Sequence, residues 1–506
     1  LLTAALLFGW PLQSLAADES PTKRPNVVFL LADDLGWRDL GCYGSDFYET
    51  PHLDKLAAEG VRFTDAYASC PVCSPSRAAV MTGKNPARIG LTAHIGDAGP
   101  NHWRRDTPLL PAPYLDRLPH SETTLVEAFH NAGYATMHAG KWHLGHEPFW
   151  PEYQGFDINV GGWSQGGPFG GKQFFSPYGN PRLPDGPEGE HLPDRLATET
   201  ARFIEAHRHE PFFIHLAWYS VHVPLVARAD LEAKYNAKLA EEDEPTGEMF
   251  DARDTKERVR QDHAVYGAMV EAMDLAVGKV LKALDDAGVA DNTIIVFTSD
   301  NGGLSTGDIG ISADQGWPTT NMPLRAGKGW MYEGGIRVPL IVKAPGRCDA
   351  GRVSDRVVTG TDYYATLLEL ADLPAAHDAV DSESFVSALS KEAEAREPVF
   401  WHYPHYGNQG GRPGGAVRDG DWKLIEWYGE DERSAVVELY NVAEDVSEAN
   451  NVADIETERR DQMLSMLREW RDSIDAKMPS PRVAPIAHKD GSPRAARAEA
   501  DDARAR

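Results

Sequence analysis

The strongest constraint on the fold of this 506-residue chain comes from two apolar runs of strand length. Each run is followed by a pair of oxygen-bearing side chains. Residues 26–31 read N-V-V-F-L-L and precede an Asp-Asp pair, and residues 293–299 read T-I-I-V-F-T-S and precede an Asp-Asn pair. Such runs are typical of buried parallel strands, whose carboxyl ends form ligand sites. An isolated Asp-Asp pair would be typical of a solvated turn, but two pairs favour a hard cation such as Ca²⁺ or Mg²⁺. We expect one ion to bind Asp33, Asp34, Asp300 and Asn301.

Residues 70–83, C-P-V-C-S-P-S-R-A-A-V-M-T-G, form a second unusual segment. The Ser-Pro-Ser after Cys73 predicts a turn and then a helix, because proline is tolerated in the first helical turn. Cys73 would then lie beside free backbone N–H groups and the positive end of the helix dipole, where an anion is stabilised. Arg77, one turn later, adds further donors. An isolated Cys-Ser-Pro would instead be typical of a helix start with a buried thiol.

Three further segments carry basic side chains. Residues 133–143 read G-Y-A-T-M-H-A-G-K-W-H, and on a strand Lys141 and His143 would share a face and address one anion. His222 follows the strand-like run 211–219, and Lys328 is flanked by glycines that allow close approach of a ligand. Taken singly, each residue would be typical of a surface or a packed loop.

Together these segments resemble the type I sulfatases of the alkaline phosphatase superfamily. Cys73-Ser-Pro-Ser-Arg77 followed by Met81-Thr82-Gly83 is similar to the first family signature, and residues 133–143 are similar to the second. The resemblance spans roughly residues 25–480. It implies that a maturation enzyme oxidises Cys73 to formylglycine (3-oxoalanine), and that this residue shares one Ca²⁺ with the four oxygen-bearing side chains.

The resemblance also implies a covalent mechanism. Hydrated formylglycine at position 73 attacks sulfur, the alcohol leaves, and the second hydroxyl then loses a proton, with help from His143, to expel sulfate. Sulfate esters are slow to hydrolyse, and an enzyme must lower the activation barrier of this reaction by on the order of 20 kcal/mol. One donor supplies only about 3 to 4 kcal/mol, so the metal and several cations must act together. Arg77 and Lys141 would hold formylglycine, and the leaving oxygen would lie beside His222 and Lys328.

The alternation of strands and helices predicts a doubly wound α/β fold with a mixed sheet flanked by helices, as in alkaline phosphatase, and a smaller C-terminal α+β domain. We expect a catalytic domain over residues 25–385 and a small sheet-plus-helix domain over 395–482. Apolar spacing in 264–287 predicts a long amphipathic helix, and the charged segment 235–260 predicts a solvated insertion or helix pair. Residues 483–506 are predicted to be disordered.

Composition narrows the partners and the compartment. The formal net charge of −27 argues against nucleic acid or an anionic membrane as the main partner. Four cysteines are too few for a disulfide scaffold, and using Cys73 for chemistry leaves at most one disulfide. Residues 1–17 resemble the remnant of a signal peptide, which predicts a periplasmic or secreted protein. A membrane anchor is the alternative, but no run reaches the roughly 18 to 20 apolar residues of a membrane span, so stable insertion is not expected.

The substrate prediction rests on aromatic and basic residues in three segments, one of which is the glycine-rich stretch G-G-W at residues 161–163. Residues 401–406 and 410–413 resemble a stretch of bacterial polysaccharide sulfatases, which implies a sulfated glycan of galactose or N-acetylgalactosamine type. The alternative is that these aromatics only pack the small domain against the large one. Two other functions stay open, namely a phosphonate or phosphodiester hydrolase of the same superfamily and a non-catalytic carbohydrate-binding relative. The candidate sugar-binding residues are Trp163, His402, His405 and Arg412.

Overall fold

The structure is a computed structural model that describes residues 24–482 apart from 242–248, 253–254, 310, 313–315, 376–379 and 392–394. The predicted signal peptide (1–17) and the predicted disordered tail (483–506) lie outside the described residues.

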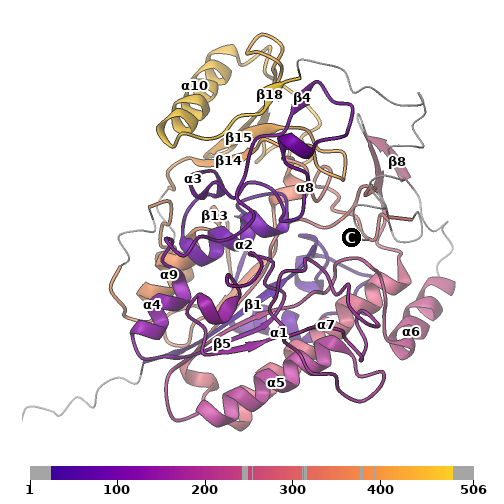
Figure 1. Ribbon diagram of the computed structural model, residues 1–506, viewed down its shortest axis with the longest axis vertical. Helices are drawn as coiled ribbons and strands as arrows, with labels where there is room; N and C mark the ends of the chain where they lie inside the picture. The colour runs from indigo at the N-terminus through magenta and orange to yellow at the C-terminus, as the bar shows by residue number, and fades with distance from the viewer. Residues whose placement is uncertain are drawn as a thin grey trace, which may run out of the picture.

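A mixed eight-stranded sheet forms the centre of the larger part of the molecule (Figure 1). β1 lies between β10 and β7 and runs parallel to both. Ala32 at the end of β1 pairs with Ser299 at the end of β10, so the carboxyl ends of the two predicted strands meet. The strand order is β12 (Arg352–Ser354), β2 (Val61–Phe63), β11 (Leu340–Lys343), β10 (Thr293–Ser299), β1 (Asn26–Ala32), β7 (Phe212–Ala217), β5 (Ala135–Gly140) and β6 (Ile158–Val160).

Helices cover both faces of this sheet, as the apolar sequence of β1 requires. Val28 and Leu30 pack on one face, and Val27, Phe29 and Leu31 pack on the other. Because neighbouring side chains on a strand point to opposite faces, a strand buried on both sides must be apolar throughout. The first face is covered by α1 (Pro51–Glu59), α5 (Leu192–His207) and α7 (Ala264–Asp286), and the second by α2 (Cys73–Thr82), α4 (Leu125–Asn131) and α9 (Asp362–Leu370).

A four-stranded antiparallel sheet follows in the C-terminal part of the chain. One face, including Trp401 and Ile425, packs against Trp330 of the larger part. The other face, including Leu424, packs against Leu467 of the last long helix, drawn at the top of Figure 1. These layers confirm the predicted fold class. The elements are β14 (Val399–Tyr403), β15 (Gly414–Asp419), β16 (Trp422–Trp427), β17 (Val436–Asn441) and α10 (Thr457–Ser473).

The charged segment 235–260, predicted to be a solvated insertion or a helix pair, does not contain a helix pair in its described residues. These comprise the later part of α6 (Ala229–Ala240) and an antiparallel hairpin of β8 (Met249–Ala252) and β9 (Thr255–Arg258). The remaining short elements are β3 (Ala66–Tyr67), α3 (Pro86–Ile89), β4 (Leu109–Leu110), α8 (Glu333–Ile336), β13 (Val358–Thr359), β18 (Ser480–Pro481) and the 3₁₀ turns Gly41–Tyr43, Pro100–His102, Pro151–Tyr153, Ala290–Asn292 and Val386–Leu389.

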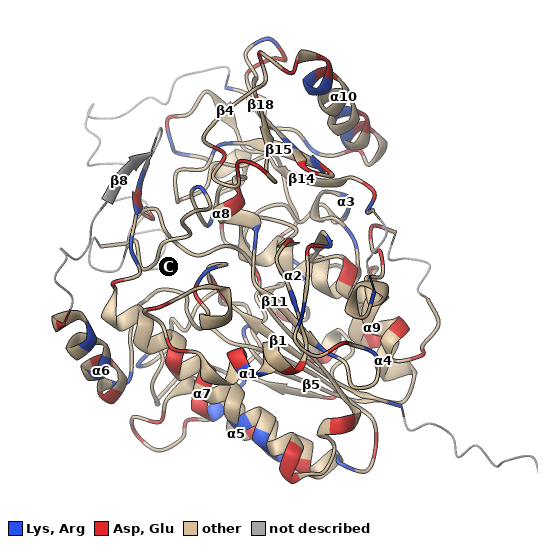
Figure 2. Ribbon diagram, turned by 180° about the vertical axis from the view of Figure 1, so that it is seen from behind, with Lys and Arg blue, Asp and Glu red and all other residues tan. Residues whose placement is uncertain are grey.

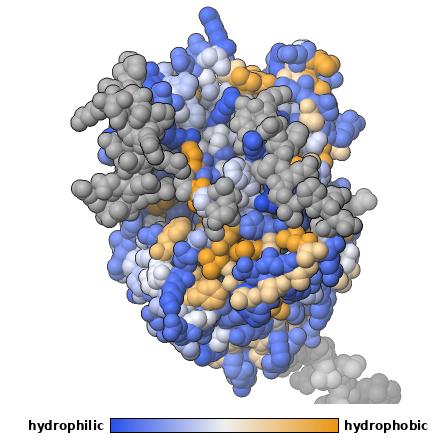
Figure 3. Space-filling model, turned by 90° about the vertical axis from the view of Figure 1, so that its right-hand side faces the viewer, coloured by the Kyte–Doolittle hydropathy of each residue, from blue (hydrophilic) through white to orange (hydrophobic). Residues whose placement is uncertain are grey.

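The surface of the helical layer is largely polar. Acidic and basic residues are interspersed along α5 and α10 in Figure 2. Figure 3 shows apolar side chains gathered in a band across the middle of one face, above a mostly hydrophilic base. Within the part of the chain that the structure describes, no helix combines the length and apolar character needed to cross a membrane.

A buried ionic network joins the small sheet to the larger part of the molecule. The Lys423 ammonium lies 2.9 Å from carboxylate oxygens of both Glu333 and Glu448, and all three side chains are fully buried. The backbone N–H of Glu333 also donates to Glu448 at 2.7 Å. Since a buried carboxylate without a counter-charge is costly, this lysine holds the two parts together.

We therefore expect Lys423→Met to lower the free energy of unfolding by about 3 to 5 kcal/mol, because it leaves the buried carboxylate of Glu448 without its counter-charge and leaves Arg337 to compensate Glu333. Urea denaturation followed by circular dichroism measures this loss. The control is Lys282→Met, whose ammonium pairs with Asp286 at the surface and whose loss should cost below about 0.5 kcal/mol. Equal effects of the two substitutions would contradict the importance of the buried network.

Candidate active site

The four predicted metal-binding side chains lie together where β1 and β10 end. Asn301 Nδ2 donates to Asp34 Oδ1 at 2.8 Å, and the backbone N–H of Asp34 lies 3.3 Å from Asp300 Oδ1. All four residues are buried. The parallel register of the two strands brings these residues together although about 266 positions separate them in sequence.

The donor set fits a divalent cation. Asp33 Oδ1 and Asn301 Oδ1 are buried oxygens for which no hydrogen-bond donor is found among the described residues. Buried polar atoms are nearly always partnered, so two such acceptors at one point indicate a missing positive group. Three carboxylates and an amide oxygen are ligands that Ca²⁺ or Mg²⁺ accepts. Asp33, Asp34 and His222 also bring one potential ligand atom each to within 4.8 Å of one another.

Cys73 is the first residue of α2, as the sequence predicts. Val72 precedes it in an extended conformation and caps the helix without a side-chain hydrogen bond. The thiol is buried, and its sulfur lies 3.3 Å from His143 Nδ1. Arg77, one turn later on the same helix, donates to Asp300 Oδ2 at 2.8 Å and to the Lys141 carbonyl at 2.9 Å. The helix thus carries the cysteine and a guanidinium to the metal-binding oxygens.

Lys141 and His143 reach the site, but not from a strand as predicted. β5 ends at Gly140, whose φ of +99° is left-handed, and His143 itself has a φ of +57°. A strand cannot continue through such a conformation, so both residues lie on the loop that follows. The Lys141 ammonium lies 2.7 Å from Asp33 Oδ2. The prediction of a shared strand face was therefore wrong, although both side chains still meet the site.

The protonation of His143 follows from its second nitrogen. Nε2 lies 2.9 Å from the carbonyl oxygen of Ile95, which can only accept a hydrogen bond. In the neutral ring Nε2 therefore carries the proton, and Nδ1 offers its lone pair toward Cys73 Sγ and toward Ser74 Oγ at 3.2 Å. This arrangement suits a base beside residue 73.

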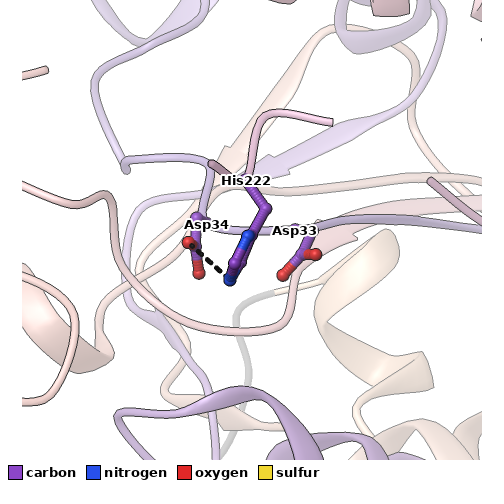
Figure 4. A group of neighbouring side chains, drawn as sticks. All are labelled: Asp33, Asp34 and His222. Atoms are coloured by element: carbon purple, nitrogen blue, oxygen red, sulfur yellow. Dashed lines mark ion pairs between the residues drawn. The ribbon is translucent and has the colours of Figure 1, made fainter. Parts of the chain in front are cut away.

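His222 and Lys328 both lie beside the Asp34 carboxylate. Figure 4 shows the His222 imidazole directed between Asp33 and Asp34, with Nε2 3.7 Å from Asp34 Oδ2. His222 Nδ1 donates to the Val223 carbonyl at 2.5 Å. The Lys328 ammonium lies 2.8 Å from Asp34 Oδ2. One imidazole and one ammonium thus lie beside the same carboxylate.

Burial and charge together set the ionisation of the carboxylates. Burial raises the pKa of Asp33 well above its usual range, the charges of Asp300 and Asp34 add to this, and Lys141 opposes it. Burial is the largest influence on Asp34 and acts to raise its pKa, but Lys328, His222 and Lys141 together outweigh burial, and the pKa is lowered. The two neighbouring aspartates therefore differ, and Asp33 has the greater need of an added cation.

Both histidines are held neutral. Burial, aided by the charge of Lys141, lowers the pKa of His143 well below its usual value. Burial, aided by the charge of Lys328, does the same to the pKa of His222. His143 can therefore accept a proton at Nδ1, whereas His222, whose Nδ1–H donates to the Val223 carbonyl, has to take up a proton at Nε2 before it can donate one to a leaving oxygen.

Comparison with known proteins assigns the family. The sequence model of the sulfatase family matches residues 25–373, and that of the C-terminal region of N-sulphoglucosamine sulphohydrolase matches residues 326–473. The chain belongs to the sulfatase family. It is an enzyme that hydrolyses sulfate esters, which confirms the sulfatase prediction over the two alternatives.

Named relatives and solved structures agree with this family. A sulfatase of Formosa agariphila is 32% identical over 88% of this chain and 88% of its own length. Human N-acetylgalactosamine-6-sulfatase is 34% identical over 75% of this chain and 68% of its own length. The crystal structure of Ps i-CgsB superposes with a TM-score of 0.70 and 27% identity, covering 88% of this chain and 93% of that one.

The candidate sugar-binding residues of this sulfatase do not form one group. His402 is buried, with its ring nitrogens 2.7 Å from Tyr428 Oη and 3.0 Å from the Lys477 carbonyl. His405 is also buried, and its Nε2 lies 2.8 Å from Thr92 Oγ1. These two histidines correspond to the packing alternative.

Trp163 and Arg412 have more open positions. Trp163 is half-buried, and its carbonyl accepts a hydrogen bond from the backbone N–H of His143 at 3.2 Å. Arg412 is exposed, and its charge acts on the pKa of Tyr406. Of the four candidates, Trp163 has a described contact with a predicted catalytic residue.

Three further residues near the site carry no sequence signal of their own. Phe169, in a glycine-rich loop, lies with its ring centroid 6.3 Å from that of His222. Asp308 and Gln409 are joined by a hydrogen bond of 2.6 Å, and Gln409 lies against Trp330, just after Lys328. The glycines around Phe169 were the one available signal, because they indicate an irregular loop that a ligand can approach.

Proposed function

We propose that this sulfatase removes sulfate from a sulfated carbohydrate, using formylglycine made from Cys73 by a maturation enzyme and one bound Ca²⁺. The observation that carries the proposal is the placement of the Cys73 thiol beside His143 Nδ1, on a helix whose Arg77 binds Asp300, together with buried oxygens of Asp33 and Asn301 for which the described residues supply no donor. A nucleophile position, a base and a cation site at one point meet the needs of sulfate ester hydrolysis.

When present, formylglycine supplies the nucleophilic hydroxyl and Ca²⁺ draws charge from the sulfate oxygens. The ligands would be Asp33, Asp34, Asp300, Asn301 and the modified residue 73. Lys141 and Arg77, paired with Asp33 and Asp300, orient these carboxylates and offer positive charge to an anionic substrate.

Proton movements fall to the two histidines. His143 is fixed by its bond to the Ile95 carbonyl, so Nδ1 can take a proton from residue 73. His222 and Lys328 lie together at Asp34 and would face the bridging oxygen, where negative charge develops as the alcohol leaves. His143 thus serves the nucleophile, and His222 with Lys328 serves the leaving group.

The carbohydrate part of the proposal draws on the relatives. The human relative is named an N-acetylgalactosamine-6-sulfatase. Ps i-CgsB, 26% identical in its complex and with a TM-score of 0.69, was solved with k-i-k-neocarrahexaose. We extend this substrate class to the present chain, with Trp163 and Arg412 as sugar contacts. The signal-peptide resemblance of residues 1–17 supports action on glycans outside the cytoplasm.

A substrate panel tests this proposal. The protein is expressed with a formylglycine-generating enzyme, and the mass of the residue 73 peptide establishes conversion. We expect 4- and 6-sulfates of galactose or N-acetylgalactosamine to be hydrolysed far faster than the corresponding phosphates. Converted protein that hydrolyses 4-nitrophenyl sulfate but no sugar sulfate would refute the carbohydrate assignment.

Substitution of His222 separates the roles of the histidines. We expect His222→Ala to lower kcat/KM on a sugar sulfate by about 10²- to 10⁴-fold, because the poor leaving group needs a proton or charge stabilisation. On 4-nitrophenyl sulfate the loss should be at least about tenfold smaller, since nitrophenolate needs little assistance. His207→Ala, at the end of α5, serves as a control and should change neither. Equal losses on both substrates would contradict the leaving-group role.

A further inference from the structure

The leaving-group side of the site has two neighbours that the mechanism does not use. One is the ring of Phe169, and the other is the carboxylate of Asp308. They come from different loops, far apart in sequence. Phe169 lies against His222, and Asp308 is linked through Gln409 to Trp330, two residues after Lys328.

Phe169 is an exposed aromatic side chain in contact with a catalytic residue. It is 57% exposed, the highest value among the exposed aromatic side chains described, and its ring meets the His222 ring edge-on at 77°. An exposed ring that contacts a catalytic residue is open to a ligand that binds at that residue, and covering the ring removes apolar surface from water. The face of a phenyl ring suits the C–H face of a sugar.

The loop that carries Phe169 is fitted to the site. A Cβ atom at Gly166 would lie 2.4 Å from His143 Cε1, so only glycine allows this loop to pass the imidazole. The same loop therefore contacts both catalytic histidines, His143 through Gly166 and His222 through Phe169. The position of this loop therefore depends on its contacts with the two histidines.

Asp308 is linked through Gln409 to the segment that follows Lys328, since the Gln409 side chain lies against Gly329. Its Oδ2 accepts a hydrogen bond from Gln409 Nε2 at 2.6 Å, and the Gln409 carbonyl accepts from Trp330 Nε1 at 2.9 Å, two residues after Lys328. Burial raises the pKa of Asp308, whereas the charge of Lys328 opposes that rise. A half-buried carboxylate that accepts one side-chain hydrogen bond among the described residues has lone pairs left to accept a hydrogen bond from a hydroxyl group.

We propose that Phe169 and Asp308 form the two walls of a leaving-group subsite, in which the ring stacks on the sugar and the carboxylate accepts a hydrogen bond from one of the sugar's free hydroxyls. The proposal rests on the proposed carbohydrate function and deepens it. Asp308 also repels negative charge, so the subsite selects a sugar without a second sulfate at that position.

The test compares converted wild type, Phe169→Ala, Phe169→Tyr and Asp308→Asn. The substrates are the galactose or N-acetylgalactosamine monosulfate turned over fastest by the wild type, the 4,6-disulfate of the same sugar, and propyl sulfate. Propyl sulfate has a leaving group as poor as a sugar alcohol but offers neither ring nor hydroxyl. Tyr153→Ala is the control, because Tyr153 is a surface aromatic, 43% exposed, on a different segment.

Phe169→Ala should lower kcat/KM on the monosulfate by about five- to tenfold, mainly through KM, with a smaller loss on propyl sulfate. Phe169→Tyr should keep most of the wild-type kcat/KM on the monosulfate, and Tyr153→Ala should have the same kcat/KM as wild type. Asp308→Asn should reduce the preference for monosulfate over disulfate by at least about fivefold, because a neutral amide removes the repulsion.

Equal losses of Phe169→Ala on the sugar and on propyl sulfate, or no loss, would overturn the stacking wall. An unchanged preference in Asp308→Asn would overturn the carboxylate wall. A wild type that hydrolyses 4-nitrophenyl sulfate but no sugar sulfate would instead reject the proposed function itself, and with it the subsite.

Discussion

Cys73→Ala is expected to lower kcat by about 10⁴- to 10⁶-fold, the range observed when a covalent nucleophile is removed. The substitution deletes the group that formylglycine is made from, while His143, Lys141 and the metal-binding oxygens stay in place. Because only one sulfur atom is lost, the free energy of unfolding should change by less than about 2 kcal/mol. Steady-state turnover of 4-nitrophenyl sulfate and a thermal melt measure the two quantities.

Cys70→Ala is the matched control for this experiment. Cys70 lies three residues earlier, is also buried, and is joined to the Ser76 hydroxyl through its backbone N–H and carbonyl. Burial raises the pKa of the Cys70 thiol, so it stays protonated and unreactive. We expect this variant to be converted at position 73 and to remain active. Near-wild-type turnover by Cys73→Ala, or full activity of protein whose Cys73 is shown by mass to be unmodified, would refute the nucleophile assignment.

The sequence predicted the parts of the site that follow from strand patterns. A strand buried on both faces has to be apolar throughout, so β1 and β10 are visible in the sequence, and their parallel pairing joins Asp33 to Asp300. The helix start at Cys73 was visible because Ser-Pro-Ser is a local signal. These features depend on short segments and on one general rule about sheet edges.

The predictions from the sequence that were wrong depend on backbone conformation and burial, which no local pattern encodes. The left-handed Gly140 ends β5 before Lys141, so the shared strand face could not hold. The aromatic and histidine residues near 402 have the composition of a sugar site, yet they are also what a small sheet needs to pack, and His402 is buried. Asp308 stayed hidden because only the folded loops link it to the segment that follows Lys328.

Removal of the metal is expected to have the second large effect. Asn301→Ala should reduce bound Ca²⁺ to near zero and lower kcat/KM by at least about 10²-fold, since a catalytic metal supplies several kcal/mol of charge stabilisation. Asn301 is the most informative ligand to replace, because its side chain pairs with no lysine or arginine among the described residues. Asp300→Ala, by contrast, would also leave Arg77 without its carboxylate partner. Metal analysis by mass spectrometry of dialysed protein, together with activity, gives the two readouts.

Thermal stability separates a bound ion from a merely structural asparagine. Asn321 is a matched control, because it is buried, donates through Nδ2 to two backbone carbonyls and has an Oδ1 for which no donor is found among the described residues, as Asn301 does. A ligand that binds only the folded state at one hundred times its Kd adds about 2.7 kcal/mol of stability. Added Ca²⁺ should therefore raise the Tm of chelator-treated wild type and of Asn321→Ala, but not that of Asn301→Ala. If chelated protein stays fully active, or if Ca²⁺ raises all three Tm values equally, the buried oxygens of Asp33 and Asn301 do not hold the ion, and their missing donors need another explanation.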